Sequence, residues 1–518
     1  MTRAGQLIHV DARAVRPSLL AASFLVAACV GVAIAISLPD VATAAIITGM
    51  LTVPFLLVAL LVRPTYGVLA LIFLAPYVDV FRFKTMGVTI RINEVLGLVL
   101  MVVAVLHVLK TRQRLRVGPF DLFVFGLLAA MITSLVVNLG NLPSEDRLRN
   151  IPTAWIGVGG VLDTPRAATW KKLAQAFVAF AAYFAVSNLI TTWRTWRKAV
   201  AVFVASGMLV CIWSLLNLAG FLAGVESAFG ITVSNIWYSG GAPRIRGTLS
   251  EPSYFANLLV LLIPVAFFCY ARGTRLIGRW QDALAAALLC ITLVFTFSGG
   301  GWVVFAVEVA IILGLFVCYR IPMDRLAAML LAIALAASLA LMAAAIFTHM
   351  DYGKLADANR KKIVALLQTG VGSGRRIAPD VGWTMFCDHP FLGVGPGRFR
   401  TFEYDYLLKM GYRGEPPGSS LYAGVMGELG LTGALMVIGL FVSAVWSSFR
   451  WAARASHRLA ASILWGMGVA FLAMGVHYLA HDVLWWPYVW VMFGLAAAGT
   501  RITRRLTRHG CTDWEADR

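Results

Sequence analysis

Residues 326–347 read LAAMLLAIALAASLALMAAAIF and contain no charged side chain. As an α-helix, a run of this length crosses the hydrocarbon layer of a bilayer, which is about 30 Å thick. A strand of a membrane barrel would instead alternate polar and apolar residues over a short segment. Because backbone polar groups must be paired inside a membrane, this run predicts a transmembrane helix.

Similar apolar runs recur along the whole chain of 518 residues. The chain is 60% hydrophobic and 13% charged, whereas soluble domains carry about 25% charged residues. This composition excludes a soluble globular protein. We predict an all-α fold, a polytopic transmembrane helix bundle of about 14 helices. Their expected spans are 18–37, 41–62, 65–81, 93–109, 119–138, 173–191, 199–223, 254–271, 281–297, 301–319, 326–347, 420–445, 459–477 and 486–500.

Short loops rich in Lys and Arg alternate with other loops along this series of helices. Such loops are expected on the cytoplasmic side of the membrane, so both termini are predicted to be cytoplasmic. The first apolar run is taken as a membrane helix rather than a removed signal. Four segments result: helices one to eleven in 1–347, a large outward loop at 348–418, helices twelve to fourteen in 419–500, and a cytoplasmic basic tail at 501–518.

The charge balance is strongly basic, with 44 Lys and Arg against 25 Asp and Glu and a formal net charge of +19. Because the cations lie in loops between lipid-length helices, the predicted partners are membrane lipids and anionic lipid-linked substrates, and no nucleic acid. The seven cysteines show no metal-ligand spacing. They therefore predict small buried hydrophobic residues without a metal site, and no cofactor is expected.

The outward segment before the helix at 254–271 carries two arginines, Arg244 and Arg246, on a stretch rich in Gly and Pro. Forked guanidinium groups beside a helix N-terminus suit a phosphate group. Glu251 directly precedes Pro252 at the expected start of the helix. It is a candidate catalytic carboxylate, and it is equally explained as an acidic residue at a helix start.

The large outward loop carries a second group of polar residues. Arg375 and Arg376 follow Gly-Ser-Gly, His389 lies in Asp-His-Pro, and Arg398 and Arg400 end the stretch GVGPGRFR. Gly and Pro at this density make tight turns that bring backbone N–H groups close to a ligand. The stretch is not a nucleotide loop, because it lacks a Lys-Ser/Thr ending and a preceding strand. Phenylalanines between the arginines suit either stacking on sugars or anchoring at the membrane interface.

The order of RIRGTLSEPSYFA, SGGGW at 298–302, SGRR, DHPFLGVGPGRF and SLYAGVMGELGLTG resembles that of the O-antigen ligase and Wzy-type polymerase superfamily, over about 240–440. The resemblance implies a C-type glycosyltransferase-like fold in the bacterial cell inner membrane, with a large periplasmic loop and a periplasmic active site. It also implies metal-independent, inverting transfer of a glycan from undecaprenyl diphosphate. On this resemblance Arg244, Arg246 and Arg376 would hold the diphosphate. The predicted substrate-binding residues are Arg375, Arg398, Arg400, His389 and Ser419.

The sequence departs from the ligase pattern at the start of the helix expected from residue 420. Ligases usually carry a His-Asn pair where Ser419 and Ser420 stand here, ahead of Glu428 and Gly430. The departure favours a polymerase, which joins undecaprenyl-diphosphate-linked oligosaccharide repeats into O-antigen or exopolysaccharide. A ligase that transfers the glycan to an acceptor such as lipid A core stays the alternative, and a chain-length regulator protein is a candidate partner of the polymerase.

The general base of such a reaction has several candidates. His477 and His481, near Asp482, would supply an imidazole from elsewhere in the chain, or they are structural residues at the membrane interface. The carboxylates to test are Glu251, Asp388 and Glu403.

Two other classes of function stay open. A transporter or flippase of lipid-linked sugars would bind the same diphosphate without transfer, and it would place charges within the membrane plane. Among Glu94, Asp121, Asp282 and Glu308, only Glu308 lies well inside its predicted span, and we expect it to pair with a neighbouring helix. A peptidoglycan-type polymerase of related fold is the third class, but its acidic signature is not found in this sequence.

Overall fold

A computed structural model describes the greater part of the chain. The described residues are 64–79, 82–85, 88–111, 118, 120–141, 165–224, 227–228, 231–232, 236–239, 242–319, 377–411 and 420–509. The predicted helices at 18–37, 41–62 and 326–347 lie outside these residues.

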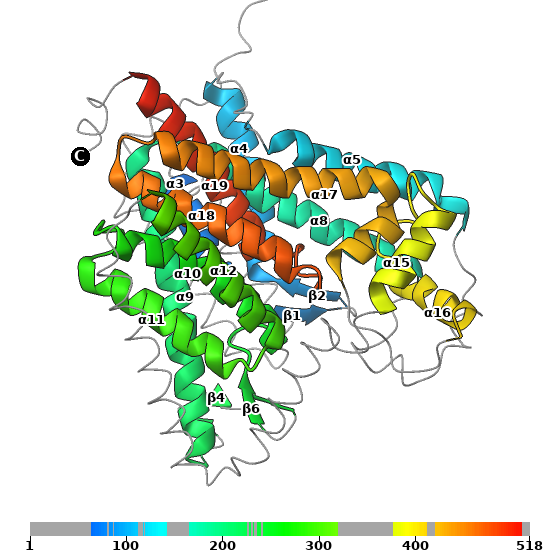
Figure 1. Ribbon diagram of the computed structural model, residues 1–518. Coiled ribbons are helices and arrows are strands. Elements are labelled where there is room, and N and C mark those ends of the chain that lie inside the picture. The colour runs from blue at the N-terminus through cyan, green and yellow to red at the C-terminus, as the bar shows by residue number, and fades with distance from the viewer. Residues whose placement is uncertain are drawn as a thin grey trace, which may run out of the picture.

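Each of the other eleven predicted spans coincides with a helix (Figure 1). These helices are α3 (Pro64–Leu74), α4 (Ile92–Thr111), α5 (Asp121–Val137), α8 (Pro165–Leu189), α9 (Trp193–Leu222), α10 (Pro252–Ala271), α11 (Arg279–Phe295), α12 (Gly299–Tyr319), α17 (Leu421–Arg454), α18 (Arg458–His477) and α19 (Pro487–His509).

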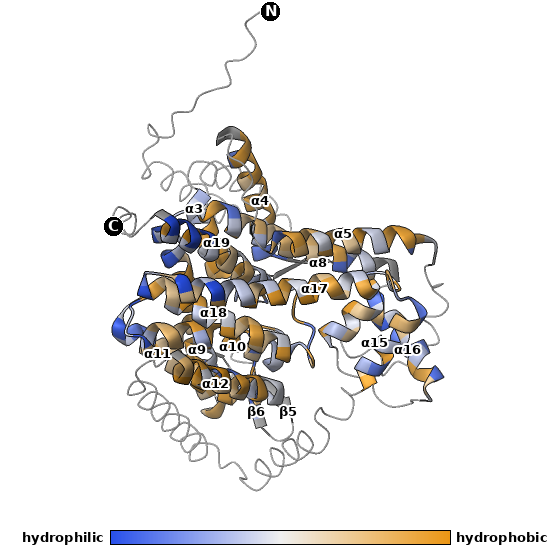
Figure 2. Cartoon of the chain, turned by 45° about the horizontal axis from the view of Figure 1, so that its top comes forward, coloured by the Kyte–Doolittle hydropathy of each residue, from blue (hydrophilic) through white to orange (hydrophobic). Residues whose placement is uncertain are grey.

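Seven of the described helices are long and apolar enough to cross a membrane: α4, α8, α9, α10, α12, α17 and α18. Helices α3 and α5 are shorter apolar helices. The chain is thus a multi-pass membrane protein, and Figure 2 shows apolar residues along its helices and hydrophilic ones where α17 and α19 end.

Helices α10 and α18 form the centre of the bundle. Within their apolar windows 89% and 83% of the residues are buried, against 28% in α12 and 33% in α4. The outer pair therefore presents much of its apolar surface outward, as lipid-facing helices do, while the central pair holds the fold together.

Helix ends differ from the predicted spans for local reasons. Helix α3 ends at Leu74 instead of residue 81, because Pro76 follows and disfavours helical geometry before it. Pro252 begins α10 at the expected place. At the C-terminus, α19 continues to His509, so much of the segment predicted as a basic tail is helical.

The large predicted loop contains two helices that the sequence analysis did not predict, α15 (Ile377–Asp388) and α16 (Phe399–Lys409). They lie beside the start of α17 (yellow in Figure 1). The all-α prediction is confirmed for the described residues, in which three short two-stranded antiparallel ribbons accompany the helices. These are β1 (Arg82–Thr85) with β2 (Val88–Arg91), β3 (Ser227–Ala228) with β4 (Ile231–Thr232), and β5 (Ile236–Ser239) with β6 (Ala242–Ile245). A 3₁₀ turn, η1, spans Leu139–Asn141.

Glu308 lies inside α12 and is completely buried. Both of its carboxylate oxygens lack a hydrogen-bond partner among the described residues. The partner expected on a neighbouring helix is therefore not found in this part of the chain.

Candidate functional site

The turn at residues 478–486 joins α18 to α19 and holds the start of α17. The backbone N–H of Leu421 donates to the carbonyl oxygens of Tyr478 (3.1 Å) and His481 (3.2 Å). The Ser420 hydroxyl caps α17 by accepting from the backbone N–H of the third residue after it, and it donates to the carbonyl of Tyr478 at 3.4 Å. The first turn of α17 is thus fixed to residues 478–486.

Two more helices reach the same turn through cations. In α8, Lys172 Nζ lies 3.0 Å from Asp482 Oδ2 and 4.9 Å from the centre of the Trp485 ring. Arg91, directly before α4, lies 5.0 Å from the centre of the Trp486 ring. Both contacts combine charge with aromatic surface.

Helices α10 and α12 meet the turn through a buried pair of imidazoles. The rings of His477 and His481 lie 4.6 Å apart. Asn257 Nδ2 lies 2.8 Å from His477 Nδ1, and the Tyr488 hydroxyl donates to Asn257 Oδ1 at 3.1 Å. A Cβ atom at Gly300 would lie 3.0 Å from His481 Nε2. The glycines that begin α12 therefore allow the imidazole to approach the helix start.

Five of the described helices thus begin around this turn, α4, α10, α12, α17 and α19, while α8 passes it two turns after its start. Each helix start carries partial positive charge and N–H groups without partners in the helix. Converging helix starts favour anions, and a phosphate group is the anion that such sites bind most readily.

A polar pocket opens beside the turn, with a volume of about 180 Å³. Its charged and amide side chains come from α8, α16, α17 and the turn. They are Lys171, Lys172, Gln175, Arg400, Glu428 and Asp482.

Glu428 is the most buried carboxylate of this pocket, with 8% of its surface exposed. Its Oε1 accepts a hydrogen bond from the backbone N–H of Phe399 at 3.2 Å. The carboxylates of Asp482 and Glu428 both attract the Lys172 ammonium group electrostatically. The pocket therefore offers charged acceptors and donors close together, which suits the hydroxyl groups of a sugar.

A break in α17 forms one wall of the site. Gly430 has φ 60° and ψ −150°, which interrupts the helix. The carbonyls of Gly427 and Glu428, before the break, accept from the backbone N–H groups of Val394 (2.9 Å) and Gly395 (3.0 Å). The GVGPG stretch therefore supplies donors to carbonyls that the broken helix leaves open.

The same loop also serves the helix after the break. The backbone N–H of Leu431 donates to the Pro390 carbonyl at 2.7 Å, and that of Thr432 donates to the Phe391 carbonyl at 3.3 Å. A Cβ at Gly430 would lie 2.6 Å from the Pro390 oxygen. The loop and the broken helix thus complete each other's backbone hydrogen bonding.

Arg398 fixes this loop from the other side. None of its surface is exposed. Its NH1 donates to the carbonyls of Asn138 (2.9 Å) and Val394 (3.3 Å), and its Nε donates to Thr169 Oγ1 at 3.2 Å. Burial lowers the pKa of the guanidinium. The predicted substrate-binding residue Arg398 is therefore placed to position the loop.

Arg400, two residues on, lines the pocket with a half-exposed side chain. Its NH1 lies 3.2 Å from Glu403 Oε2. Glu403 is 1% exposed, and burial raises its pKa to about 7 although Arg400 lowers it.

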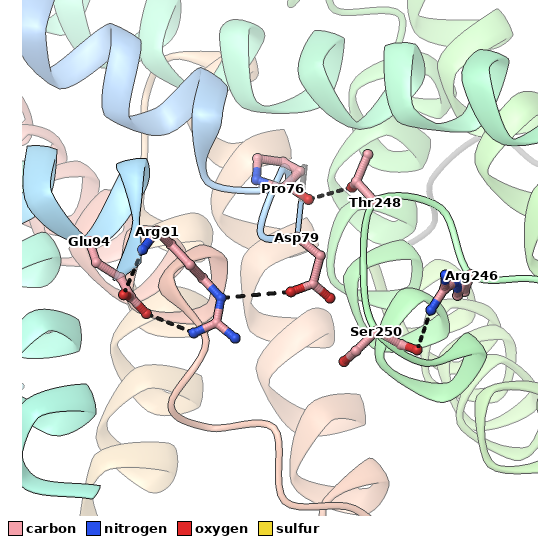
Figure 3. Close-up of polar contacts among 7 residues, drawn as sticks. All are labelled: Pro76, Asp79, Arg91, Glu94, Arg246, Thr248 and Ser250. Atoms are coloured by element: carbon pink, nitrogen blue, oxygen red, sulfur yellow. Dashed lines mark hydrogen bonds and ion pairs between the residues drawn. The ribbon is translucent and has the colours of Figure 1, made fainter. Parts of the chain in front are cut away.

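The two arginines before α10 make contacts that shape the helix start. Arg244 Nε donates to the carbonyl of Thr296 at 3.0 Å, at the end of α11. Arg246 NH1 donates to the carbonyl of Ser250 at 3.2 Å, as Figure 3 shows. Arg244 is thus joined to the α11–α12 turn, a few residues before the glycine that adjoins His481.

Glu251 precedes α10 at its N-cap position and makes no side-chain cap hydrogen bond. Its Oε2 accepts from the Ser253 hydroxyl at 3.2 Å. The carboxylate lies at the helix start, as expected.

Three charged side chains, Arg91, Glu94 and Asp79, form a brace between the start of α4 and the segment after α3 (Figure 3). Arg91 NH1 donates to Glu94 Oε1 at 2.9 Å, and Arg91 Nε lies 3.7 Å from Asp79 Oδ1. The backbone N–H of Asp79 donates to the carbonyl of Thr248 at 3.0 Å. The brace thereby links α3, α4 and the turn before α10.

Another predicted site residue, His389, does not line the pocket. His389 is exposed, and its carbonyl accepts from the backbone N–H of Gly393 at 3.1 Å. Arg375, Arg376 and Ser419 lie outside the described residues.

The pocket contains residues that sequence reasoning missed, above all Lys172. Its partner Asp482 lies 310 positions away in the sequence. Adjacent Lys171 and Lys172 near the start of an apolar helix were the only local signal. Within the described ranges, no three His, Cys, Asp or Glu side chains gather as a metal ion would require.

Residues 284–438 match the family model described as Wzy_C: O-Antigen ligase. The match covers α12, α15, α16, most of α11 and the first half of α17, with the break and the loop that fills it. Arg244, Arg246 and Glu251 lie before the matched segment. No curated protein matches the chain.

Proposed function

Since residues 284–438 carry the O-antigen ligase family domain, we propose that this chain is a membrane glycosyltransferase acting on undecaprenyl-diphosphate-linked oligosaccharides. It polymerises the lipid-linked repeats into a surface or secreted polysaccharide. It lies in the bacterial inner membrane with both termini in the cytoplasm, and its site faces the periplasm.

The observation that carries the proposal is the polar pocket beside five helix starts, at the end of a lipid-embedded bundle. Converging helix starts favour a diphosphate, and the pocket beside them offers partners for sugar hydroxyls. The orientation is supported by the basic residues at the opposite end, where α8, α10, α17 and α19 finish.

In the proposed reaction, a hydroxyl of the incoming repeat attacks C1 of the lipid-linked chain. The bond from C1 to the diphosphate oxygen breaks, with inversion at C1, and the hydroxyl proton passes to a base. Negative charge grows on the leaving diphosphate. Arg244, Arg246 and Arg376, with the helix starts, stabilise that charge without a metal ion or cofactor.

The base is best sought at the pocket. Of the carboxylates considered from the sequence, Glu403 is buried, Asp388 accepts from the Tyr406 hydroxyl at 2.7 Å, and Glu251 lies at a helix start. Asp482 lines the pocket itself. We assign it the contact with the attacking hydroxyl, with Lys172 holding it in place.

A polymerase is favoured over a ligase by the start of α17. Ser420 serves as its helix cap, where the family's ligases usually carry a His-Asn pair. A ligase acting on an acceptor such as lipid A core is the second candidate, because the matching family model is described as an O-antigen ligase.

Purified protein incubated with a lipid-linked repeat tests the proposal. We expect release of undecaprenyl diphosphate together with longer glycan chains. Arg246→Ala should lower the rate by about 10² to 10³, while Arg508→Ala, an exposed control at the other end, should leave it unchanged. Diphosphate release only when lipid A core is added would indicate a ligase. Movement of the intact substrate across a vesicle membrane without release would indicate a flippase and refute the proposal.

A further inference from the structure

A second cavity lies at the end of the bundle opposite the polar pocket. Its volume is about 490 Å³. Three separate segments line it: the start of α9, the α10–α11 turn, and the α17–α18 turn with the start of α18. Their polar residues there are Arg197, Thr274, Arg275, Ser456, His457 and Arg458.

The cavity gathers three arginines, and no acidic side chain is among its lining residues. Among the described residues, no carboxylate lies within 4.0 Å of Arg197, Arg275 or Arg458. The nearby carboxylate of Asp282 accepts from two backbone N–H groups of the α10–α11 turn, at 2.8 and 3.0 Å. The repulsion between Arg458 and Arg272, added to burial, lowers the pKa of Arg272. Asp282 attracts Arg197 electrostatically, but within the described part of the chain no carboxylate forms an ion pair with any of the three arginines.

Two further hydrogen bonds hold the polar groups that line the cavity. Arg197 NH2 donates to the carbonyl of Arg275 at 3.4 Å, which joins two of the three segments. His457 Nδ1 caps α18 by accepting from the backbone N–H of Ala460 at 3.4 Å. The N-terminus of α18 thus opens into the cavity and adds its partial positive charge.

An aromatic side chain lies next to the cavity. The Trp193 ring, at the start of α9, lies 4.7 Å from the ring of His457. Indole rings are enriched where membrane helices enter the headgroup layer. The cavity also lies at the ends of the membrane-length helices α9, α10, α17 and α18, where lipid headgroups are expected.

We propose that this cavity binds the phosphodiester headgroup of an anionic membrane phospholipid. Arg197, Arg275 and Arg458 face one space from three segments, and guanidinium groups bind phosphate oxygens in pairs. Basic pockets between membrane helices are known to hold such headgroups. A bound lipid would join the α10–α11 turn to the start of α18, and so would clamp the central pair of helices.

The proposal is tested by native mass spectrometry of the full chain in detergent, titrated with phosphatidylglycerol. We expect a saturable lipid adduct. Arg197→Gln and Arg458→Gln should each weaken binding about fivefold, and Arg458→Lys should fall between them and the wild type. Arg508→Gln removes an exposed charge at the same end without touching the cavity, and it should bind like the wild type. Thermal unfolding without added lipid shows whether each variant is folded.

Three results would overturn the proposal. Equal weakening by Arg508→Gln would show that only the general positive charge matters. Phosphatidylcholine binding as tightly as phosphatidylglycerol would exclude selection of an anionic lipid. Displacement of the lipid by inorganic phosphate at equal concentration would assign the cavity to a soluble anion. Because none of these measurements uses glycosyl transfer, they stand or fall independently of the proposed function.

Discussion

Gly430→Ala perturbs the break in α17, where the loop carrying GVGPG is held. The backbone there has φ 60° and ψ −150°, a region that only glycine occupies readily, and strain of this kind costs about 1–3 kcal/mol. The new Cβ would also lie 2.6 Å from the Pro390 oxygen, which is a backbone atom and cannot rotate away. Four backbone hydrogen bonds join the loop to the helix around the break, each worth about 1 kcal/mol. We expect the loop to detach in part, with a loss of about 3–5 kcal/mol.

Limited proteolysis of the purified variant measures this loss directly. Cleavage between residues 388 and 398 should become much faster, and glycosyl transfer should fall, because Glu428 loses the backbone N–H of Phe399. Gly314→Ala is the matched control, since no atom lies within 4 Å of its new Cβ and alanine favours helices. If Gly430→Ala resists the protease and keeps its activity as well as Gly314→Ala does, the argument from the break is refuted.

Three further predictions concern single residues. Lys172→Met should destabilise the protein by about 1–3 kcal/mol, because the partly buried Asp482 loses its charged partner; thermal unfolding would show this, and a smaller loss in the Lys172→Met/Asp482→Leu double variant would confirm the pairing. Glu403 holds its proton to a pKa of about 7 instead of 4.5, so stability should fall as pH rises from about 4.5 to 7 and then level off. Glu403→Gln should remove this dependence and gain about 3 kcal/mol above pH 7; identical pH profiles would contradict the assignment. Gly300→Ala should displace the His481 ring and lower the transfer rate while the melting temperature stays within a few degrees of wild type, and an unchanged rate would separate this imidazole from the reaction.

The hydrophobic runs were sufficient to predict every membrane-length helix that the structure describes, because an apolar run of that length has few other solutions in a bilayer. They could not predict α15 and α16. These polar helices are held by a small core of their own, with Val381, Met385 and Leu407 fully buried. Their stability comes from packing against α17 and not from a periodic apolar face.

The candidate site was predicted less completely, and Arg398 shows why. An arginine in a glycine-rich loop indicates anion binding when only the sequence is known. Its burial depends on α5 and α8, which are more than 200 residues away. The same holds for the contact between Lys172 and Asp482, since long-range pairs leave no local pattern. The family match identifies the domain at residues 284–438, but Arg244 and Arg246 lie before the matched segment.

The interlocking of the loop with the broken helix limits where the chain can change in length. A residue inserted between 390 and 395 would move the backbone N–H and C=O groups of the loop out of register with their partners in α17. Insertions should therefore not be tolerated there. The exposed bend at Gly411, with no atom within 4 Å of its side-chain position, has no such tie. An epitope or fluorescent label placed at that bend should leave the loop and the break in α17 undisturbed.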